Sequence, residues 1–444
     1  MSGVSTNPRA RRLFVEALGC KVSRVDAGWT AAPFARAASP AGADVVLLHG
    51  CAVTERALRD GRRAVRRLRR ESPEATLVVS GCLAEDAARD LAAMREVDLV
   101  VPLTARAGLG ALLDARDAGL LPGKIAGDDG TRGAALFAMP AEGRAASALL
   151  DAGRTRAFLK IQDGCRRRCA FCIVPKLRGE ERSAAGVHVA DAVRALGASG
   201  VPEVVLTGIH LAAFGRSNRD KGGLLALLDD LERDPPACRV RLSSLEPMEA
   251  GVELVDRVAA SRVFVPHLHL PLQSGSASVL GRMRRGIVPS RYRALARAAV
   301  RANPRLHLAT DLIAGFPGET DAEFAETLRF VEDLPFASLH VFPFSPRAGT
   351  DAAAWHRESA VPARTVTERT RALRRLGDEQ AAGFAARASG TVADLVVLRG
   401  GRGLTDHYLD VRLRLPAADA APGRRLAVRL VASPEDGTLE AHPC

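Results

Sequence analysis

The chain lacks any long apolar segment. Its 444 residues contain no run near the roughly 18 apolar residues that a membrane span requires, and the first twenty, MSGVSTNPRARRLFVEALGC, lack the apolar core of a signal peptide. We therefore expect a cytoplasmic protein. Aromatic residues make up only 4% of the chain, and it has only eight cysteines. In a reducing compartment, cysteines that cluster indicate a metal or catalytic site rather than disulfides.

The length and charge set further bounds. A chain of 444 residues exceeds one hydrophobic core, so we expect two or three domains. The composition, 47% hydrophobic and 26% charged, is typical of a globular protein. The net charge of +12 is compatible with a polyanionic partner such as RNA, and equally with an arginine-rich composition that serves no partner.

Three Gly-Cys pairs follow predicted strands in the N-terminal part. The cysteines are 31 residues apart, about the length of one βαβ step, and they are Cys20, Cys51 and Cys82. Because parallel strands end at one edge of a sheet, these thiols should converge in a doubly wound α/β domain. Three thiolates favour a metal site, although a free cysteine is often only a small buried residue.

A second βα alternation begins near residue 156. Its six predicted strands are 156–162, 203–208, 239–244, 266–272, 308–314 and 338–344. Six units predict a partial (β/α)6 barrel with its chemistry in the loops after the strands. A helix over 361–387 follows, and the tail has the short alternating strands of a small β-barrel. The expected division is an N-terminal domain 11–122, a linker 123–150, a barrel 151–383 and a tail domain 384–444.

The stretch DGCRRRCAFCIVP follows the first barrel strand and holds Cys165, Cys169 and Cys172. Three soft ligands hold a metal centre and leave one coordination position open, which marks a reactive site rather than a structural one. The alternative is a zinc knuckle with a remote fourth ligand. The spacing, with Phe171 before the last cysteine, resembles the signature of the radical S-adenosylmethionine (SAM) superfamily.

Both cysteine groups together resemble the methylthiotransferases, which join a three-cysteine domain, a radical SAM barrel and a TRAM domain. The resemblance covers residues 11 to 440. The matching strings are ALGCKV, GCAVT, VSGCLAE, KIQDGCRRRCAFCIVPKLRG, LTGIHL, LSSLEP, HLPLQSGS, DLIAGFPGET and LHVFPFSPRAGT. Several of them are similar to the branch that acts on N6-threonylcarbamoyladenosine at tRNA position 37.

This resemblance implies the cofactors and their chemistry. One 4Fe–4S cluster, on Cys165, Cys169 and Cys172, would cleave SAM to a 5′-deoxyadenosyl radical that takes hydrogen from C2 of the adenine. A second, on Cys20, Cys51 and Cys82, would supply a methylated sulfur. The residues expected around SAM are Gly208, Glu246, Gln273, Gly315 and Phe316, each alternatively an ordinary turn or strand-end residue.

The resemblance implies two partners: the anticodon loop of tRNA, and an electron donor such as flavodoxin or ferredoxin. It implies no membrane contact and does not identify the sulfur source, and we expect a monomer.

Three surfaces are candidates for RNA contact. The first is a predicted helix capped by Thr54, with Arg59, Arg62, Arg63 and Arg66 on one face; a solvated charged face is the alternative. The second is Arg166–Arg168. The third is the tail, where eight arginines against seven acids leave only +1, so that contacts would come from single side chains such as Tyr408 and Arg412.

The chain departs from the family pattern at a few places. His49-Gly50 replaces an Asn-Thr pair before Cys51, Ser23 and Asp26 replace Asn and Glu after Cys20, and Ala184 replaces an arginine. None is a thiol, so cluster assembly should survive with altered tuning of the second site. Three alternative functions stay open: action on isopentenyladenosine, action on a ribosomal-protein aspartate, and an RNA-binding iron–sulfur sensor without turnover.

Overall fold

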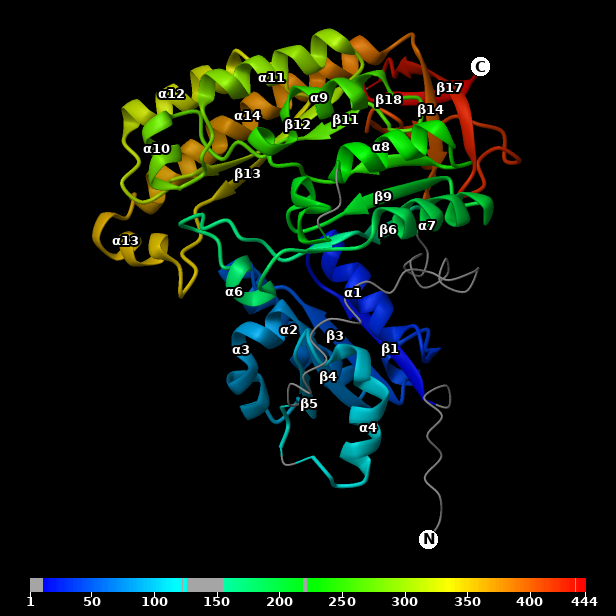
Figure 1. Ribbon diagram of the computed structural model, residues 1–444, viewed down its shortest axis with the longest axis vertical. Helices are drawn as coiled ribbons and strands as arrows, with labels where there is room; N and C mark the ends of the chain where they lie inside the picture. The colour runs from blue at the N-terminus through cyan, green and yellow to red at the C-terminus, as the bar shows by residue number, and fades with distance from the viewer. Residues whose placement is uncertain (1–10, 122, 126–154, 219–221, 436) are drawn as a thin grey trace. The chain divides into compact units, whose positions relative to one another are not determined.

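The computed structural model describes residues 11–121, 123–125, 155–218, 222–435 and 437–444. The chain forms two compact units, of which the first holds residues up to 151 together with 173–180, and the second holds the rest (Figure 1). Most of the expected linker 123–150 lies outside the described residues. Of its described part, Ile125 forms a parallel bridge to Val100 at the edge of the N-terminal sheet. None of the described helices is long and apolar enough to cross a membrane.

The N-terminal unit is a parallel sheet with helices on both faces, as predicted. The strand order is β2-β1-β3-β4-β5. The strands are β1 Arg12–Ala17, β2 Ala35–Arg36, β3 Val45–Gly50, β4 Thr76–Gly81 and β5 Leu99–Val101. The helices are α1 Lys21–Ala31, α2 Glu55–Glu71, α3 Cys82–Ala93, α4 Leu109–Asp117 and α6 Val174–Arg178.

Alternation along the strands gives this sheet a separate core on each face. Leu77 and Val79 of β4 join the cluster under α2 and α3, whereas Val78 between them joins the cluster that includes Ala31 of α1 and Leu113 of α4. The helix predicted after Cys51 is present, and the side chain of Thr54 caps it by accepting from the backbone N–H of Ala57 at 3.1 Å.

The second unit contains the predicted partial barrel. Its six parallel strands are β6 Ala157–Lys160, β9 Glu203–Thr207, β10 Arg239–Leu242, β11 His267–His269, β12 His307–Ala314 and β13 Ser338–Pro343. They form two three-stranded sheets that a parallel bridge between Val240 and Phe264 joins. A short hairpin pairs β7 (Gln162–Asp163) with β8 (Arg182–Ser183).

The helices of this unit lie outside the strands, and most of them cover the outer face of the barrel (Figure 1). They are α7 Gly186–Ala198, α8 Gly223–Arg233, α9 Pro247–Ala260, α10 Ala277–Arg282, α11 Pro289–Ala302, α12 Asp321–Glu332, α13 Asp351–Ser359 and α14 Ala363–Ala388. Helix α12 begins with a complete capping box between Thr320 and Glu323. Helix α14 is the long helix expected over 361–387, and it continues past the expected domain boundary at 383.

The tail forms the expected closed β-barrel, in the order β14-β15-β16-β18-β17. Its strands are β14 Val392–Val397, β15 Arg402–Thr405, β16 Asp410–Leu413, β17 Arg425–Ala432 and β18 Leu439–Pro443. The core under these strands includes Leu395, Val411 and Leu430. Closure removes the exposed strand edges that a small sheet would otherwise present.

Candidate active site

In the N-terminal unit, the glycines before the cysteines are required by close backbone packing. Gly19 has φ +125°, and a Cβ there would lie 2.7 Å from the Cβ of Cys51. Gly81 has φ +86°, and a Cβ there would lie 2.5 Å from the carbonyl oxygen of Gly50. Both positions therefore exclude side chains. Glycine precedes the cysteines because the strand ends pack too closely for a side chain at these positions.

The three cysteines of this unit follow neighbouring strands of the sheet. Cys20 caps α1, Cys51 follows β3, and Cys82 is the first residue of α3, so they end three neighbouring strands. Burial raises the pKa of the Cys82 thiol to about 11; Arg178 opposes this, and the charges of Cys20 and Cys51 add to it. The pKa of Cys51 is likewise raised, first by burial. Thiols with raised pKa values keep their protons at neutral pH, so metal binding at these residues would release protons.

In the second unit, backbone bonds hold the loop with the other three cysteines. The N–H of Ala170 donates to the carbonyl of Met283 at 3.0 Å, and its carbonyl accepts from the N–H of Ala352 at 2.9 Å. The N–H of Cys172 donates to the carbonyl of Cys169, which makes a tight turn. All three cysteines are partly exposed. The loop thus presents its thiols at the mouth of the barrel, after its first strand.

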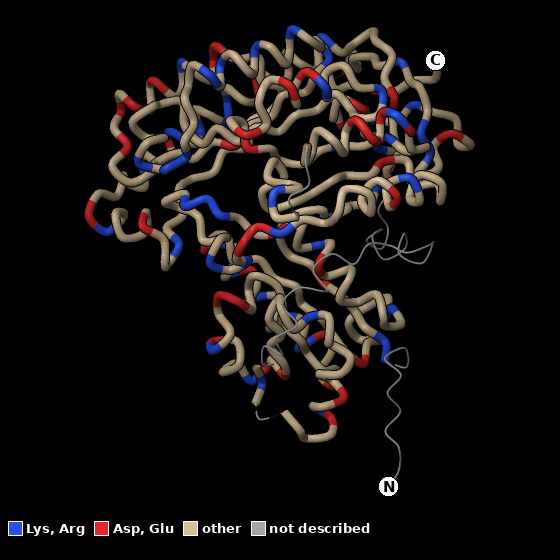
Figure 2. Tube along the Cα trace, in the orientation of Figure 1, with Lys and Arg blue, Asp and Glu red and all other residues tan. Residues whose placement is uncertain are grey.

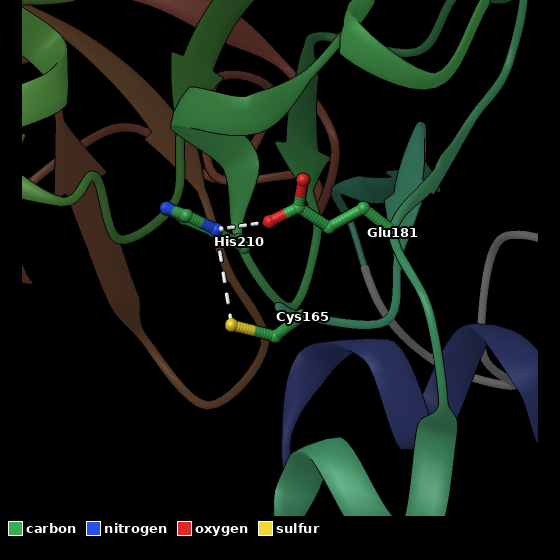
Figure 3. A group of neighbouring side chains, drawn as sticks. All are labelled: Cys165, Glu181 and His210. Carbon is green, nitrogen blue, oxygen red and sulfur yellow. Dashed lines mark hydrogen bonds and ion pairs between the residues drawn. The ribbon is translucent and has the colours of Figure 1, made fainter. Parts of the chain in front are cut away.

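His210 contacts this loop, although no pattern in the sequence had predicted a role for it. Its Nδ1 lies 3.0 Å from the carboxylate of Glu181 and 3.8 Å from Cys165 Sγ (Figure 3), and its Nε2 lies 3.0 Å from Glu249. Burial alone would lower the pKa of His210, but hydrogen bonds with Cys165 and Glu249 raise it to about 10. A cationic imidazole therefore stands beside the Cys165 sulfur. In the sequence, His210 lies within the string LTGIHL, which matches the family but gives no function for the histidine.

Arginines complete this polar surround. Arg167 donates its backbone N–H to Cys165 Sγ at 3.4 Å and its guanidinium to Glu249 at 2.6 Å. Arg285 lies 3.7 Å from Cys169 Sγ. Arg167 thus has a local role beside Cys165 and an intramolecular carboxylate partner, so its prediction as an RNA contact gains no support.

The structure gives the predicted SAM residues different environments. Gly208 follows β9, and a Cβ there would lie 2.9 Å from the Cβ of Gln162, so its backbone approaches β7 closely. Glu246 is buried, and its carboxylate binds Arg285 at 2.7 Å. Gln273 has φ +80° and pairs through its backbone with β12. Glu246 therefore positions Arg285 and Arg167 beside the cysteine loop.

The other two predicted residues lie after β12. Gly315 has φ +77°, and a Cβ there would lie 2.4 Å from Val366 of α14. Phe316 is fully buried and packs edge-on against Phe344 in the same hydrophobic cluster as Ala170. This burial favours support of the cysteine loop over direct contact of the Phe316 ring with a ligand.

A second polar cluster faces the side of the sheet opposite α11. Asp311 of β12 lies 2.9 Å from Nε2 of His269 on β11 and 3.1 Å from Nδ1 of His340 on β13. Ser244 Oγ lies 2.6 Å from the other ring nitrogen of His269. The pKa of Asp311 is well below its usual range, because the bonds from the two histidines outweigh its burial.

Some side chains of the predicted RNA surfaces make intramolecular contacts instead. On α2, Arg62 binds Asp90 at 2.9 Å, while Arg59 and Arg66 are exposed. Acidic and basic residues are interspersed along the chain (Figure 2). Tyr408 in the tail packs its ring 4.7 Å from the guanidinium of Arg241 and 4.4 Å from the ring of His267. Tyr408 therefore attaches the small barrel to the large one.

Known proteins match both cysteine domains. The radical SAM superfamily matches residues 159–331, and the uncharacterized protein family UPF0004 matches residues 12–102. The threonylcarbamoyladenosine tRNA methylthiotransferase MtaB of Bacillus subtilis is 34% identical, over 89% of this chain and 88% of its own. The tRNA-2-methylthio-N(6)-dimethylallyladenosine synthase of Erythrobacter litoralis is 32% identical, over 81% and 79%.

A solved structure shares the fold. The radical SAM methyltransferase TsrM of Kitasatospora setae, solved with cobalamin and a [4Fe-4S] cluster, aligns with a TM-score of 0.52 at 15% identity, over 88% of this chain and 80% of its own. The fold and sites define a radical SAM enzyme. More particularly, the chain belongs to the tRNA methylthiotransferase family.

Members of this family use SAM and 4Fe–4S clusters, and the residues present fit these groups. Each unit offers three thiols from one sheet edge or one loop, a donor set that suits iron–sulfur clusters with an open iron. The radical SAM cysteines lie beside the charged residues His210 and Arg167. Cluster sulfurs are stabilised by such donors.

Proposed function

We propose that the chain methylthiolates C2 of N6-threonylcarbamoyladenosine at position 37 of tRNA. The observation that carries this proposal is the pair of three-thiol groups, together with a relative that is named for this reaction and matches over 89% of the chain. When bound, a cluster at Cys165, Cys169 and Cys172 supplies the electron that cleaves SAM, and one at Cys20, Cys51 and Cys82 supplies sulfur.

The protein's own side chains have supporting roles in this reaction. Arg167 and Arg285 donate to the sulfurs of Cys165 and Cys169, which orients the thiolates and stabilises their charge. His210, fixed between Glu181 and Glu249, places a further positive charge beside Cys165. The exposed arginines of α2, such as Arg59 and Arg66, offer contacts for the tRNA phosphates.

The polar cluster of His269, Asp311 and His340 supports the threonylcarbamoyl substituent over a dimethylallyl one. The ligand atoms of these three residues lie within 4.8 Å of one another on neighbouring strands, and His340 is half-exposed. A threonylcarbamoyl group carries urea, hydroxyl and carboxylate groups that can hydrogen-bond there, whereas a dimethylallyl group has no polar atom to offer the cluster. A site of polar groups rejects an apolar analogue strongly.

The test is turnover on two tRNA substrates. Anaerobically reconstituted protein with SAM and a reductant is incubated with tRNA carrying either threonylcarbamoyladenosine or dimethylallyladenosine, and digested nucleosides are analysed by mass spectrometry. We expect the methylthio product from the first tRNA only, and none from the Cys20→Ala or Cys165→Ala variants. A product from the dimethylallyl tRNA alone would assign the other substrate. 5′-Deoxyadenosine without a methylthio product from either tRNA would contradict the proposal.

A further inference from the structure

A buried group of charged side chains adjoins Cys82 inside the N-terminal unit. Arg178 donates from Nη1 to a carboxylate oxygen of Asp26 at 3.0 Å, and Arg106 binds the other oxygen of the same carboxylate at 3.1 Å. The Asp26 side chain is 0% exposed and that of Arg178 is 1% exposed. Buried charges of this kind persist only with excellent geometry, so the group holds Arg178 in one orientation.

In that orientation the Nε–H of Arg178 points at the sulfur of Cys82. The Nε of Arg178 donates to Cys82 Sγ at 3.3 Å, within the limits of a hydrogen bond to sulfur. Arginine is suited to this double task, because its planar fork binds a carboxylate with one edge while Nε–H remains free for another acceptor.

Arg178 reaches this position from a distant part of the sequence. It ends the short helix α6, which begins two residues after Cys172 but packs within the N-terminal unit. The neighbouring Leu177 packs on the hydrophobic cluster that contains Cys82. Asp26 lies on α1, the helix that follows Cys20. The hydrogen bonds of Arg178 thus connect the elements that carry Cys20 and Cys82.

We infer that Arg178 is a positioning residue for the iron–sulfur cluster at Cys20, Cys51 and Cys82: through its Nε–H it orients the Cys82 sulfur and raises the reduction potential of that cluster. The inference rests on the ligand assignment made under the proposed function. Hydrogen bonds and positive charge at a ligand sulfur stabilise the reduced, more negative cluster. Asp26 and Arg106 act indirectly, because they hold the guanidinium of Arg178 in place.

The experiment isolates this cluster in the full-length chain. In a Cys165→Ala, Cys169→Ala, Cys172→Ala background, only the second cluster can be reconstituted anaerobically, and its reduction is followed by EPR during a redox titration without tRNA. We expect Arg178→Gln to raise the ratio of oxidised to reduced cluster at a fixed potential about tenfold, which is about 59 mV for a one-electron couple. Arg106→Gln, which keeps the bond to sulfur, is the matched control and should change the ratio less than about twofold.

A second variant guards against loss of the cluster. Arg178→Lys keeps a positive charge beside Asp26 but lacks Nε–H, so it should retain iron and show a shift in the same direction. No shift in whichever Arg178 variant retains four irons, or an equal shift in Arg106→Gln, would overturn the inference. If the triple-alanine background itself binds no iron, the ligand assignment fails, which the iron content reports separately from the potential.

Discussion

Glu203 is a buried carboxylate that lies among three arginines in the second unit. It lies 3.0 Å from Arg156, 2.7 Å from Arg239 and 2.9 Å from Arg241, and its side chain is 0% exposed. Burial alone would raise the pKa of Glu203, but Arg241 and Arg239 outweigh it and hold the pKa far below the usual range. Glu203 is therefore ionised in the folded protein throughout the neutral range.

Replacing Glu203 with glutamine tests how much this charge contributes. The side chains of Arg239 and Arg241 are each 2% exposed. The substitution removes the carboxylate that both guanidinium groups share and leaves Arg239 with the more distant Asp394 at 3.5 Å. Breaking a buried ion pair from one side costs about 3–5 kcal/mol. At roughly 2 °C per kcal/mol for a unit of this size, the unfolding midpoint should fall by about 6–10 °C.

The same substitution should loosen the small barrel. Arg239 donates to the carbonyl of Asp394 at 2.7 Å, and Arg241 donates to the carbonyl of Asp406 at 3.1 Å. When Glu203 no longer orients these arginines, amide hydrogens of β14 and β15 should exchange faster. Both bonds cross from the barrel strand β10 to the tail.

The assay is thermal unfolding by circular dichroism at one scan rate, with hydrogen exchange by mass spectrometry. Arg156→Gln is the control, because the Arg156 side chain is 18% exposed and its loss leaves Glu203 paired with two buried arginines. A fall of less than about 3 °C for Glu203→Gln, or an equal fall for the control, would refute the reasoning. It would mean that the buried guanidinium groups do not depend on this carboxylate.

Two further predictions concern other positions. Gly81→Ala places a Cβ 2.5 Å from the carbonyl oxygen of Gly50, so reconstituted iron should fall from about eight to about four atoms per chain. The control Gly119→Ala, at φ +69° with open space around it, should keep the full iron content. Equal iron in both variants would contradict the role of Gly81. For His307, burial and then the charge of Arg241 lower the pKa to about 3, so it stays neutral while the unfolded chain takes up a proton below about pH 6.5. Stability should therefore fall as the pH drops from 6.5 toward 3, by up to about 1.4 kcal/mol per unit. The substitution His307→Phe should reduce that fall, measured as the difference in midpoint between pH 7 and pH 5; an unchanged difference would contradict it.

Much of the architecture could be predicted from periodicity. The six barrel strands, the Gly-Cys strand ends and the helix after Thr54 all lie where the patterns of apolar residues and caps put them. These signals are local: each strand or cap is specified by residues within a few positions of itself. The placement of Cys20, Cys51 and Cys82 after neighbouring strands could be predicted because a parallel sheet brings strand ends to one edge.

The polar surround of the cysteines could not be predicted in this way. The bond of Arg178 to Asp26 joins residues 152 positions apart, and that of His210 to Glu181 joins residues 29 apart. No period in the sequence relates such pairs, because the side chains meet only after the elements have packed. Phe316 shows the opposite error: a motif placed it correctly after β12, but only packing reveals that its ring is fully buried.

Net charge was the least informative property, and the buried arginines explain why. Arg178, Arg239 and Arg241 are all nearly inaccessible, and each serves a specific carboxylate, sulfur or carbonyl rather than the surface. The charge of +12 therefore overstates the cationic surface that an RNA meets. Exposed arginines, not the total, determine how many phosphates can be neutralised. In this chain the exposed side of α2, with Arg59 and Arg66, is a stretch where charge and accessibility coincide. The salt dependence of tRNA binding should therefore respond to these two residues and not to the buried three.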